Sequence, residues 1–304
     1  MKIGVTGASG FIARHTIKEL QSRGYEVVGF DRQVHRGEDM DLFVGDMLDD
    51  IDMTEFVAHV DGVIHLAGVL GTQETIDNPR PATMSNVLGG LNMLEAVAQY
   101  DVPAVYICVG NRGMYSTYSL SKSLVEDFCH MFNMYRDTRV NMVRAVNAYG
   151  PGQSVAAPFG SSKVRKITPS FVCRALTDMD IELYGGGTQV SDMVYVGDVA
   201  TALVNALEEA MLGNVLDKPV EVGPKQQHTV REVAELIREL ANSKSKITSL
   251  PMRKGETPNA IVSADYESLK QIGMDVEELR PLAEGMQETI DWYRDNMGEL
   301  WVQP

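Results

Sequence analysis

The chain has 304 residues, 44% hydrophobic and 23% charged, which is enough to bury a full core as one large domain or two unequal ones. Asp and Glu number 42 against 27 Lys and Arg, so the formal net charge is −15 at pH 7. Because such a charge repels phosphates, neither a nucleic acid nor an anionic membrane is expected as a partner.

The three cysteines, Cys108, Cys129 and Cys173, are too few and too scattered for a disulfide framework or a zinc site, so no metal is expected. All lie among apolar residues, which is typical of buried thiols in a reducing compartment. No apolar run approaches the ~20 residues of a membrane-spanning helix. A strand pattern begins at the second residue, so we expect no signal peptide and a soluble, cytoplasmic protein.

The first segment, residues 2–13, reads as a short apolar strand, a glycine-containing turn and the start of an amphipathic helix. Backbone N–H groups at such a helix N-terminus favour a pyrophosphate, through hydrogen bonds and the helix dipole. Gly7 permits the tight turn, Gly10 allows close approach of the phosphates, and Ala13 replaces the usual third glycine. The residues expected to contact a dinucleotide here are Gly7, Ser9, Gly10, Phe11 and Ile12.

The second predicted strand, residues 26–30, ends at Asp31, at the distance from Gly7 that a dinucleotide site requires. A carboxylate there can accept hydrogen bonds from both ribose hydroxyls and would repel a 2′-phosphate. The sequence therefore predicts NAD rather than NADP. Arg32 weakens this preference a little, because an arginine can pair with a phosphate.

The first half of the chain alternates between apolar runs and helix-period stretches. Near-continuous apolar strands separated by helices predict an α/β fold with a doubly wound parallel sheet of the Rossmann type. The expected strands are 3–5, 26–30, 62–66, 104–109 and 140–145, and the expected helices are 11–23, 82–100 and 117–135.

The texture changes after residue 150 to loops rich in Gly, Pro and Ser, with Lys163, Arg165 and Lys166 clustered. Alternation returns at 192–205, and helices follow at 229–240 and 281–293. We expect a dinucleotide-binding domain of residues 1–150 plus about 192–213. A smaller, discontinuous C-terminal substrate domain is expected over 151–191 plus about 214–304, forming the second wall of the cleft at the strand ends.

The helix expected after the strand at 104–109 begins close to Tyr118 and Lys122. Residues four apart share a helix face, so the ammonium of Lys122 can reach the neighbourhood of the Tyr118 hydroxyl. A nearby cation favours phenolate, so we expect a lowered pKa and a general-base role for Tyr118. Lys122 could also hydrogen-bond the nicotinamide ribose.

With these residues, the chain resembles the extended short-chain dehydrogenase/reductase family, in particular its NAD-dependent epimerase/dehydratase branch acting on nucleotide sugars. The motifs occur in the family's order over nearly the whole chain. They are residues 6–13 (TGASGFIA), 45–47 (GDM), 65–68 (HLAG), 86–90 (NVLGG), 118 with 122, 144–153 (RAVNAYGPGQ), 183–187 (LYGGG), 191–198 (SDMVYVGD) and 253–256 (RKGE).

The resemblance implies NAD as cofactor and a nucleotide sugar, with a UDP-sugar favoured, as substrate. The cofactor residues that it implies are Asp46 and Met47 against the adenine, Leu66, Ala67 and Gly68 along the cleft, and Asn86 behind it. The substrate residues that it implies are Asn147 and Arg253 at the diphosphate, Tyr184 near the nucleotide, and Ser191. Lys163, Arg165 and Lys166 either contact the sugar nucleotide or belong to a solvated loop face. We interpret His65 as a structural histidine at a strand end.

The chain departs from the family at the loop before Tyr118. The hydroxyl residue that usually follows this strand falls on Asn111, or on Gly110 with a one-residue slip, and the loop after it is much shortened. Asn111 can hydrogen-bond a sugar oxygen but cannot relay a proton. Ser116 or Thr117 could replace the hydroxyl, although a helix N-cap suits them better. A second departure is Ser191, where an arginine usually clamps the diphosphate.

No carboxylate lies between Cys108 and Tyr118, where the family's dehydratases carry an Asp-Glu pair and its decarboxylases a glutamate. Dehydration is therefore not expected, and epimerisation is favoured over decarboxylation. The resemblance leads us to expect a UDP-hexose 4-epimerase-like enzyme with Tyr118, Lys122 and Asn111 as catalytic residues. A net oxidoreductase and a non-catalytic NAD-binding protein stay open. A homodimer through helices 82–100 and 117–135 is also implied.

Overall fold

The computed structural model describes residues 1–33, 40–257 and 259–300, so the last four residues of the expected second domain lie outside it. Its centre is a seven-stranded, wholly parallel sheet in the order β11-β6-β5-β4-β1-β2-β3. The order changes direction between β1 and β4, and ligands bind beyond the strand ends at such a switch point. The strands are β1 (Lys2–Thr6), β2 (Glu26–Asp31), β3 (Asp41–Val44), β4 (Gly62–His65), β5 (Ala104–Cys108), β6 (Val140–Ala145) and β11 (Val220–Val222).

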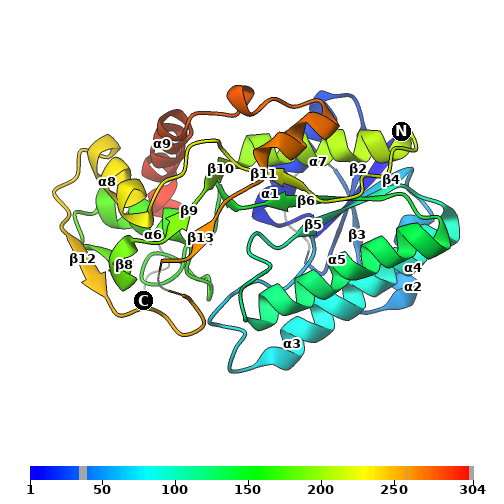
Figure 1. Ribbon diagram of the computed structural model, residues 1–304, viewed down its shortest axis with the longest axis horizontal. Helices are drawn as coiled ribbons and strands as arrows, with labels where there is room; N and C mark the ends of the chain where they lie inside the picture. The colour runs from blue at the N-terminus through cyan, green and yellow to red at the C-terminus, as the bar shows by residue number, and fades with distance from the viewer. Residues whose placement is uncertain (34–39, 258, 301–304) are drawn as a thin grey trace.

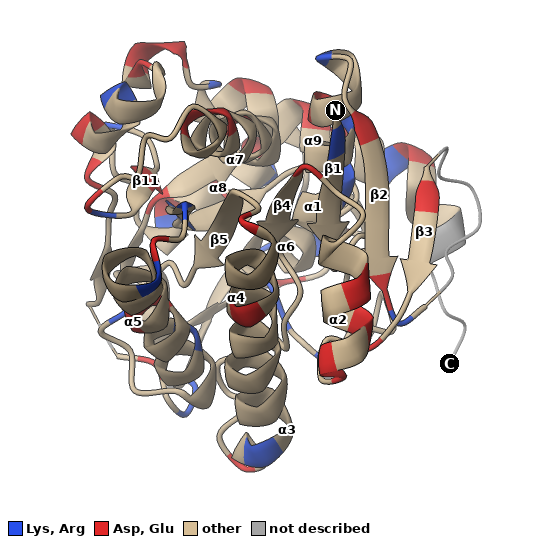
Figure 2. Cartoon of the chain, turned by 90° about the vertical axis from the view of Figure 1, so that its right-hand side faces the viewer, with Lys and Arg blue, Asp and Glu red and all other residues tan. Residues whose placement is uncertain are grey.

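Helices cover both faces of the sheet, as parallel strands require (Figure 1). One face packs on α1 (Phe11–Ser22) and α7 (Val196–Met211) through buried Val, Leu and Ile side chains. The other packs on α2 (Asp50–Val57), α4 (Gly89–Tyr100) and α5 (Thr117–Arg136), which lie side by side in Figure 2. The prediction of a doubly wound α/β fold is confirmed.

Several short elements were not predicted. Residues 41–57 contain β3 and α2. These elements were missed because six of the seventeen positions are acidic, so that no regular spacing of apolar residues is evident. The helix expected over 82–100 is divided into α3 (Pro79–Thr83), the π-helical turn η1 (Met84–Leu88) and α4. Alternation expected over 192–205 ends at Tyr195, where α7 begins.

The second lobe consists of short ladders and helices around a core of its own, which includes Phe171, Leu183, Ile237, Ile290 and Tyr293. Its two-stranded ladders pair β7 with β10, β8 with β12 and β9 with β13. Its elements are β7 (Asn147–Tyr149), α6 (Ile167–Leu176), β8 (Ile181–Tyr184), η2 (Gly185–Gly187), β9 (Val190–Ser191), β10 (Met193–Tyr195), α8 (Val230–Leu240), β12 (Ile247–Leu250), β13 (Ile261–Val262) and α9 (Leu282–Leu300). Between β13 and α9, η3 (Tyr266–Ile272) and η4 (Val276–Glu278) pack against the first lobe instead.

The expected domain boundary near residue 213 is too early. β11 pairs with β6 in the main sheet, and Leu269 and Ile272 of η3 are buried in the core of the α1–α7 face. Three residues of β11 are too short a run to be distinguished from a loop by periodicity alone.

Candidate active site

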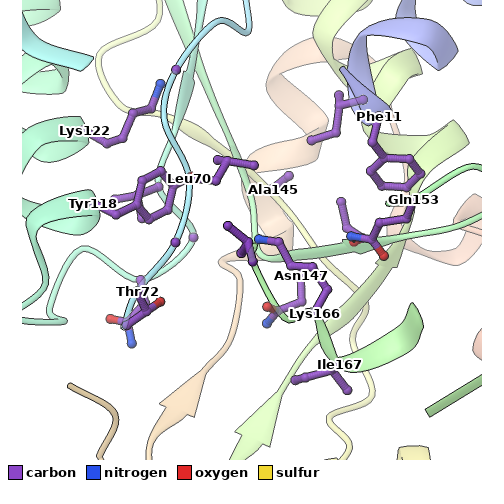
Figure 3. Close-up of a pocket in the computed structure, with 18 of the residues that line it drawn as sticks. Phe11, Leu70, Thr72, Tyr118, Lys122, Ala145, Asn147, Gln153, Lys166 and Ile167 are labelled. Carbon is purple, nitrogen blue, oxygen red and sulfur yellow. The ribbon is translucent and has the colours of Figure 1, made fainter. Parts of the chain in front are cut away.

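A cavity of about 750 Å³ opens at the carboxyl ends of β1, β4 and β5, and segments of the second lobe form its opposite wall (Figure 3). This is the switch-point crevice that the sheet order predicts. Among the residues labelled in Figure 3, Tyr118 and Lys122 extend from α5 on one side, while Phe11 and Gln153 lie on the other.

The turn between β1 and α1 forms a cradle of bare backbone. Gly7 has φ +67°, and its N–H donates to the carbonyl of Phe30 at 2.8 Å. A Cβ on Gly10 would lie 2.9 Å from the carbonyl oxygen of Gly7, so only glycine fits there. No side chain caps α1, which leaves its first N–H groups for an anion. The cradle fits the pyrophosphate of a dinucleotide.

Asp31 closes the cofactor end of the cavity. One carboxylate oxygen accepts the N–H of Ser9 at 3.0 Å and the other that of Gln33 at 3.3 Å. Each oxygen retains a lone pair that a ribose hydroxyl can use. Arg32, beside it, is exposed and also lines the cavity.

The end of β4 is tied to β1 by a buried hydrogen-bonded group. The hydroxyl of Thr6 accepts the N–H groups of Leu66 and Ala67, both at 3.2 Å, and lies 2.9 Å from Nδ1 of His65. Burial lowers the pKa of His65 to about 3, so the ring is neutral. His65 does not line the cavity and instead fastens the end of β4 to Thr6, in keeping with its interpretation as structural.

Asn86 fastens the loop that follows β4. Its side-chain oxygen accepts the N–H of Val69 at 2.8 Å, and its amide nitrogen donates to the carbonyl of Val69 and to the hydroxyl of Ser121. It lies in the π-helical turn η1, a conformation frequent at functional sites. Asn86 does not line the cavity and supports it from behind.

The pair expected at the adenine is divided. Met47 lines the cavity, whereas Asp46 does not: its carboxylate accepts the N–H of Leu48 at 3.0 Å within a turn. The sequence expectation that Asp46 lies against the cofactor therefore lacks support from the cavity lining. Its side chain is used to shape the turn that places Met47.

Tyr118 and Lys122 both line the cavity. We expected the Lys122 ammonium to lower the Tyr118 pKa, but among the described residues it does not contribute to that pKa. The ammonium of Lys122 lies 4.0 Å from the ring centroid of Tyr106, and burial lowers its pKa to about 8. Burial, followed by the neighbouring Cys108 thiol, raises the pKa of Tyr118 to about 12. The expected lowering of the Tyr118 pKa was wrong, because burial disfavours the phenolate and the Lys122 ammonium rests on the Tyr106 ring instead.

The loop between β5 and α5 brings Asn111 to the cavity. A Cβ on Gly110 would lie 2.6 Å from the carbonyl of Val146, so no side chain can project from that position. Asn111 accepts the N–H of Gly113 through its side-chain oxygen at 3.1 Å. Ser116 is the N-cap of α5, and Thr117 donates to the carbonyl of Thr75 at 2.9 Å, so both hydroxyls are already used.

Arg112 turns away from the cavity, a feature that the sequence did not predict. Its guanidinium bonds Glu126 at 2.7 Å and Asp127 at 2.6 Å, both on α5. Glu126 also accepts Arg144 at 2.9 Å, and Arg144 in turn donates to the carbonyl of Val109 at 2.6 Å. A buried ionic network therefore holds both ends of the short segment that carries Asn111.

The second-lobe wall groups amide, hydroxyl and cationic side chains. Asn147 of β7 donates to the hydroxyl of Ser191 of β9. Arg165 donates to the hydroxyl of Tyr184 at 2.5 Å, and the guanidinium of Arg253 lies 5.2 Å from the ring centroid of the same tyrosine. All five line the cavity, as expected of a surface for a phosphorylated ligand.

Lys163 is exposed and does not line the cavity, so its expected place in the site is not supported. Lys166, the N-cap of α6, does line it. Lining residues that were not predicted include Glu74, Gln153 and Gln189. The side-chain oxygens of the two glutamines are buried without a hydrogen-bond partner among the described residues. Glu74 and Gln189 lie in loops that no sequence pattern marks, whereas Gln153 ends the motif at residues 144–153 but was given no role there.

Fold and site define a dinucleotide-binding protein of the Rossmann type whose cofactor cleft adjoins a polar pocket. Residues 3–217 match the model of the NAD dependent epimerase/dehydratase family, and the chain belongs to that family. NAD is thus the cofactor of this chain, as predicted. The family comprises nucleotide-sugar epimerases, dehydratases and decarboxylases.

Individual relatives are distant but match nearly the whole chain. The chain is 26% identical to UDP-N-acetyl-alpha-D-glucosaminuronate decarboxylase of Bacillus cytotoxicus, over 96% of this chain and 97% of the relative. It superposes on UDP-glucose 4-epimerase of Thermus thermophilus in complex with NAD with a TM-score of 0.81 and 26% identity, covering 97% and 99%. UDP-glucose 4-epimerase of Thermotoga maritima, with UDP-glucose, matches at a TM-score of 0.85 and 23% identity, covering 98% and 100%, which shows the common fold.

Proposed function

We propose that the protein is an NAD-dependent nucleotide-sugar epimerase, resembling the UDP-hexose 4-epimerases. One observation carries the proposal. Tyr118 and Lys122 line the cavity beside the dinucleotide cradle, while the loop leading to them contributes an amide and no carboxylate. Oxidation and re-reduction of a ring carbon need a proton acceptor and a hydride acceptor. Elimination of water also needs a carboxylate acid or base, which this loop lacks.

NAD, when bound, accepts a hydride from the sugar and can return it. The residues of this chain do the rest. Gly7, Gly10 and Asp31 bind the cofactor. Tyr118 takes the proton of the reacting hydroxyl and gives it back, and Asn111 donates its amide to the sugar oxygen. The nucleotide diphosphate is held by the second-lobe wall, through Asn147, Ser191, Tyr184, Arg165 and Arg253.

The phenol of Tyr118 sets a pH requirement on this chemistry. With a pKa raised to about 12, Tyr118 is a neutral phenol at pH 7, so proton uptake requires its ionised minority. Turnover limited by the phenolate fraction therefore increases as pH rises above 7. In the return step, the neutral phenol is already the proton donor that the keto oxygen needs.

The relatives support the general class of reaction and divide on the particular one. One is a decarboxylase of a UDP-sugar acid and another a UDP-glucose 4-epimerase, at equal identity. The family's decarboxylases carry a glutamate in the loop where this chain has Arg112 and Gly113. Arg112 is committed to Glu126 and Asp127, so it does not replace that carboxylate.

The test is incubation of the NAD-loaded protein with UDP-, GDP- and dTDP-hexoses and with a UDP-uronate, read by chromatography and by the absorbance of NADH. The proposal expects interconversion of two isomeric sugar nucleotides with no net NADH. Steady formation or consumption of NADH would instead indicate a net oxidoreductase. Release of CO₂ from the uronate would indicate a decarboxylase. If every sugar nucleotide is unchanged, the protein binds NAD without catalysis.

We also propose a homodimer through the surface of α4 and α5. These helices carry few charged positions (Figure 2), and Leu88, Leu120, Leu124 and Met131 are between 36% and 55% exposed. A two-fold contact would cover them. Light scattering should give twice the mass of one chain, and Leu120→Glu with Leu124→Glu should give a monomer.

In the described part of the chain, no helix is long and apolar enough to cross a membrane.

A further inference from the structure

The ammonium group of Lys122 is buried without a carboxylate partner. The residue is 4% exposed, and no ion pair joins its nitrogen to an acidic side chain among the described residues. Glu126, one turn further along α5, is bonded to Arg112 and Arg144 instead. A buried cation without a counter-ion is costly, so another group must offset the loss of hydration.

The ring of Tyr106 is that group. Tyr106 lies on β5, is fully buried, and has its ring centroid 4.0 Å from the Lys122 nitrogen. The face of an aromatic ring carries partial negative charge, and its attraction for a cation is greatest where water is excluded. Tyr106 does not line the cavity, so it can affect a bound ligand only through Lys122.

The orientation of this ring is fixed on two sides. The Tyr106 hydroxyl donates to the backbone carbonyl of Lys122 at 3.3 Å. Its ring also stacks on that of His65, with centroids 5.9 Å apart and planes 15° from parallel. Because His65 is a neutral ring, it adds no second positive charge next to the ammonium.

We propose that Tyr106 is a positioning residue whose ring face replaces a counter-ion and holds the Lys122 ammonium at the floor of the cofactor cleft. This inference rests on the proposed function and on the expectation from the sequence that Lys122 hydrogen-bonds the nicotinamide ribose. The ring holds a cation without lending it a full negative charge, so the ammonium stays available to hydrogen-bond a ligand. A carboxylate in the same place would bind it too firmly for that.

Other groups act on Lys122 from three elements. Burial lowers the Lys122 pKa, and three neighbours raise it: Cys108 of β5, and Cys129 and Glu126 of α5. Tyr118 shares its helix face, and His65 lies on β4. The ring variants below change none of these residues, so a change in the proton affinity of Lys122 reports on the ring.

The test is an NMR titration of carbon-labelled lysine in the protein without cofactor, with Lys122→Met used to assign the resonance. In the natural protein the pKa should lie near 8. Tyr106→Phe keeps the ring and should leave the proton affinity within about twofold. Tyr106→Leu and the better-filling Tyr106→Met should both lower it about tenfold or more, as loss of a desolvated cation–π contact requires. Equal titration of the Phe, Leu and Met variants would overturn the proposal.

Binding of NAD provides a second arm. Tyr106→Leu and Tyr106→Met should weaken NAD binding several-fold, as Lys122→Met also should, while Tyr106→Phe should bind normally. Adding Lys122→Met to Tyr106→Leu should cause no further loss, because both act through one ammonium. Additive losses would contradict the proposal. Neither arm needs a sugar substrate, so failure of the proposed epimerase activity would appear in the substrate panel and leave these results interpretable.

Discussion

Arg112 is bonded to Glu126 at 2.7 Å, away from the cavity, although its loop is the one in which the family's dehydratases carry catalytic carboxylates. Glu126 is 2% exposed and is shared with Arg144. The ion pair between Arg112 and Glu126 thus fixes the loop that carries Asn111, and this loop presents no carboxylate to the cavity. For this reason we propose oxidation and re-reduction at one carbon rather than elimination.

Glu126→Gln should destabilise the protein, because among the described residues it leaves the buried Arg144 with Glu221 as its one charged partner and Arg112 without a buried one. Removing one member of a buried ionic network costs about 3 kcal/mol or more. Urea denaturation measures the loss. Asp127→Asn is the matched control: it removes the exposed partner of the same Arg112 and should cost less than about 1 kcal/mol. Equal losses would mean that the network does not hold the loop.

Asn111→Asp should reduce turnover while keeping the fold of the loop. The aspartate can still accept the N–H of Gly113, but it loses the amide donor that we assign to the sugar oxygen. Loss of such a donor lowers kcat about tenfold to a hundredfold. Asn111→Ser should recover part of the activity, since a hydroxyl can donate as well. Full activity of the Asp variant in the substrate assay would remove Asn111 from the site.

Asp31→Asn should weaken binding of NAD and reduce discrimination against NADP. A hydrogen bond to a charged group contributes about 1.5–3 kcal/mol, so the loss should be roughly tenfold or more in affinity. Calorimetric titration with each dinucleotide measures both effects. Arg32→Gln is the control and should weaken only the binding of NADP. If Asp31→Asn changes neither affinity, the carboxylate does not contact the ribose.

His65 should make the protein acid-sensitive. Its pKa is about 3 when folded and 6.5 when unfolded, so the unfolded state binds a proton first as pH falls below 6.5. Stability is then lost progressively toward pH 3, by about 2 kcal/mol between pH 7 and pH 5. Urea midpoints at these two pH values test this. His65→Gln cannot titrate, so its stability should fall less over the same interval.

The alternation of apolar runs and helix-period stretches was sufficient to predict the sheet and the cofactor cradle, because both depend on local patterns. Gly7, Gly10 and Asp31 lie where the spacing placed them. Elements stabilised mainly by tertiary contacts escaped prediction, above all β11, which is strand only because β6 lies beside it. The π-helical turn around Asn86 also leaves no periodic signal.

Most of the residues predicted for the site line the cavity, whereas their electrostatics could not be predicted. Tyr118 and Lys122 were found by their spacing, yet spacing alone cannot show that the ammonium rests on Tyr106 from another strand. Burial, which raises the Tyr118 pKa, is likewise a property of the fold. Lys163 and Lys166 differ by three positions, and only the start of α6 decides which of them faces the cavity.

The most direct measurement is the turnover of Tyr118→Phe on the sugar nucleotide identified by the panel, beside Tyr115→Phe. Tyr115 is three residues away, 89% exposed and outside the cavity lining. Loss of general-base assistance should reduce kcat of Tyr118→Phe about a hundred- to ten-thousandfold, with NAD binding intact and Tyr115→Phe unaffected. Full activity of Tyr118→Phe would contradict the assignment of its hydroxyl as the proton acceptor.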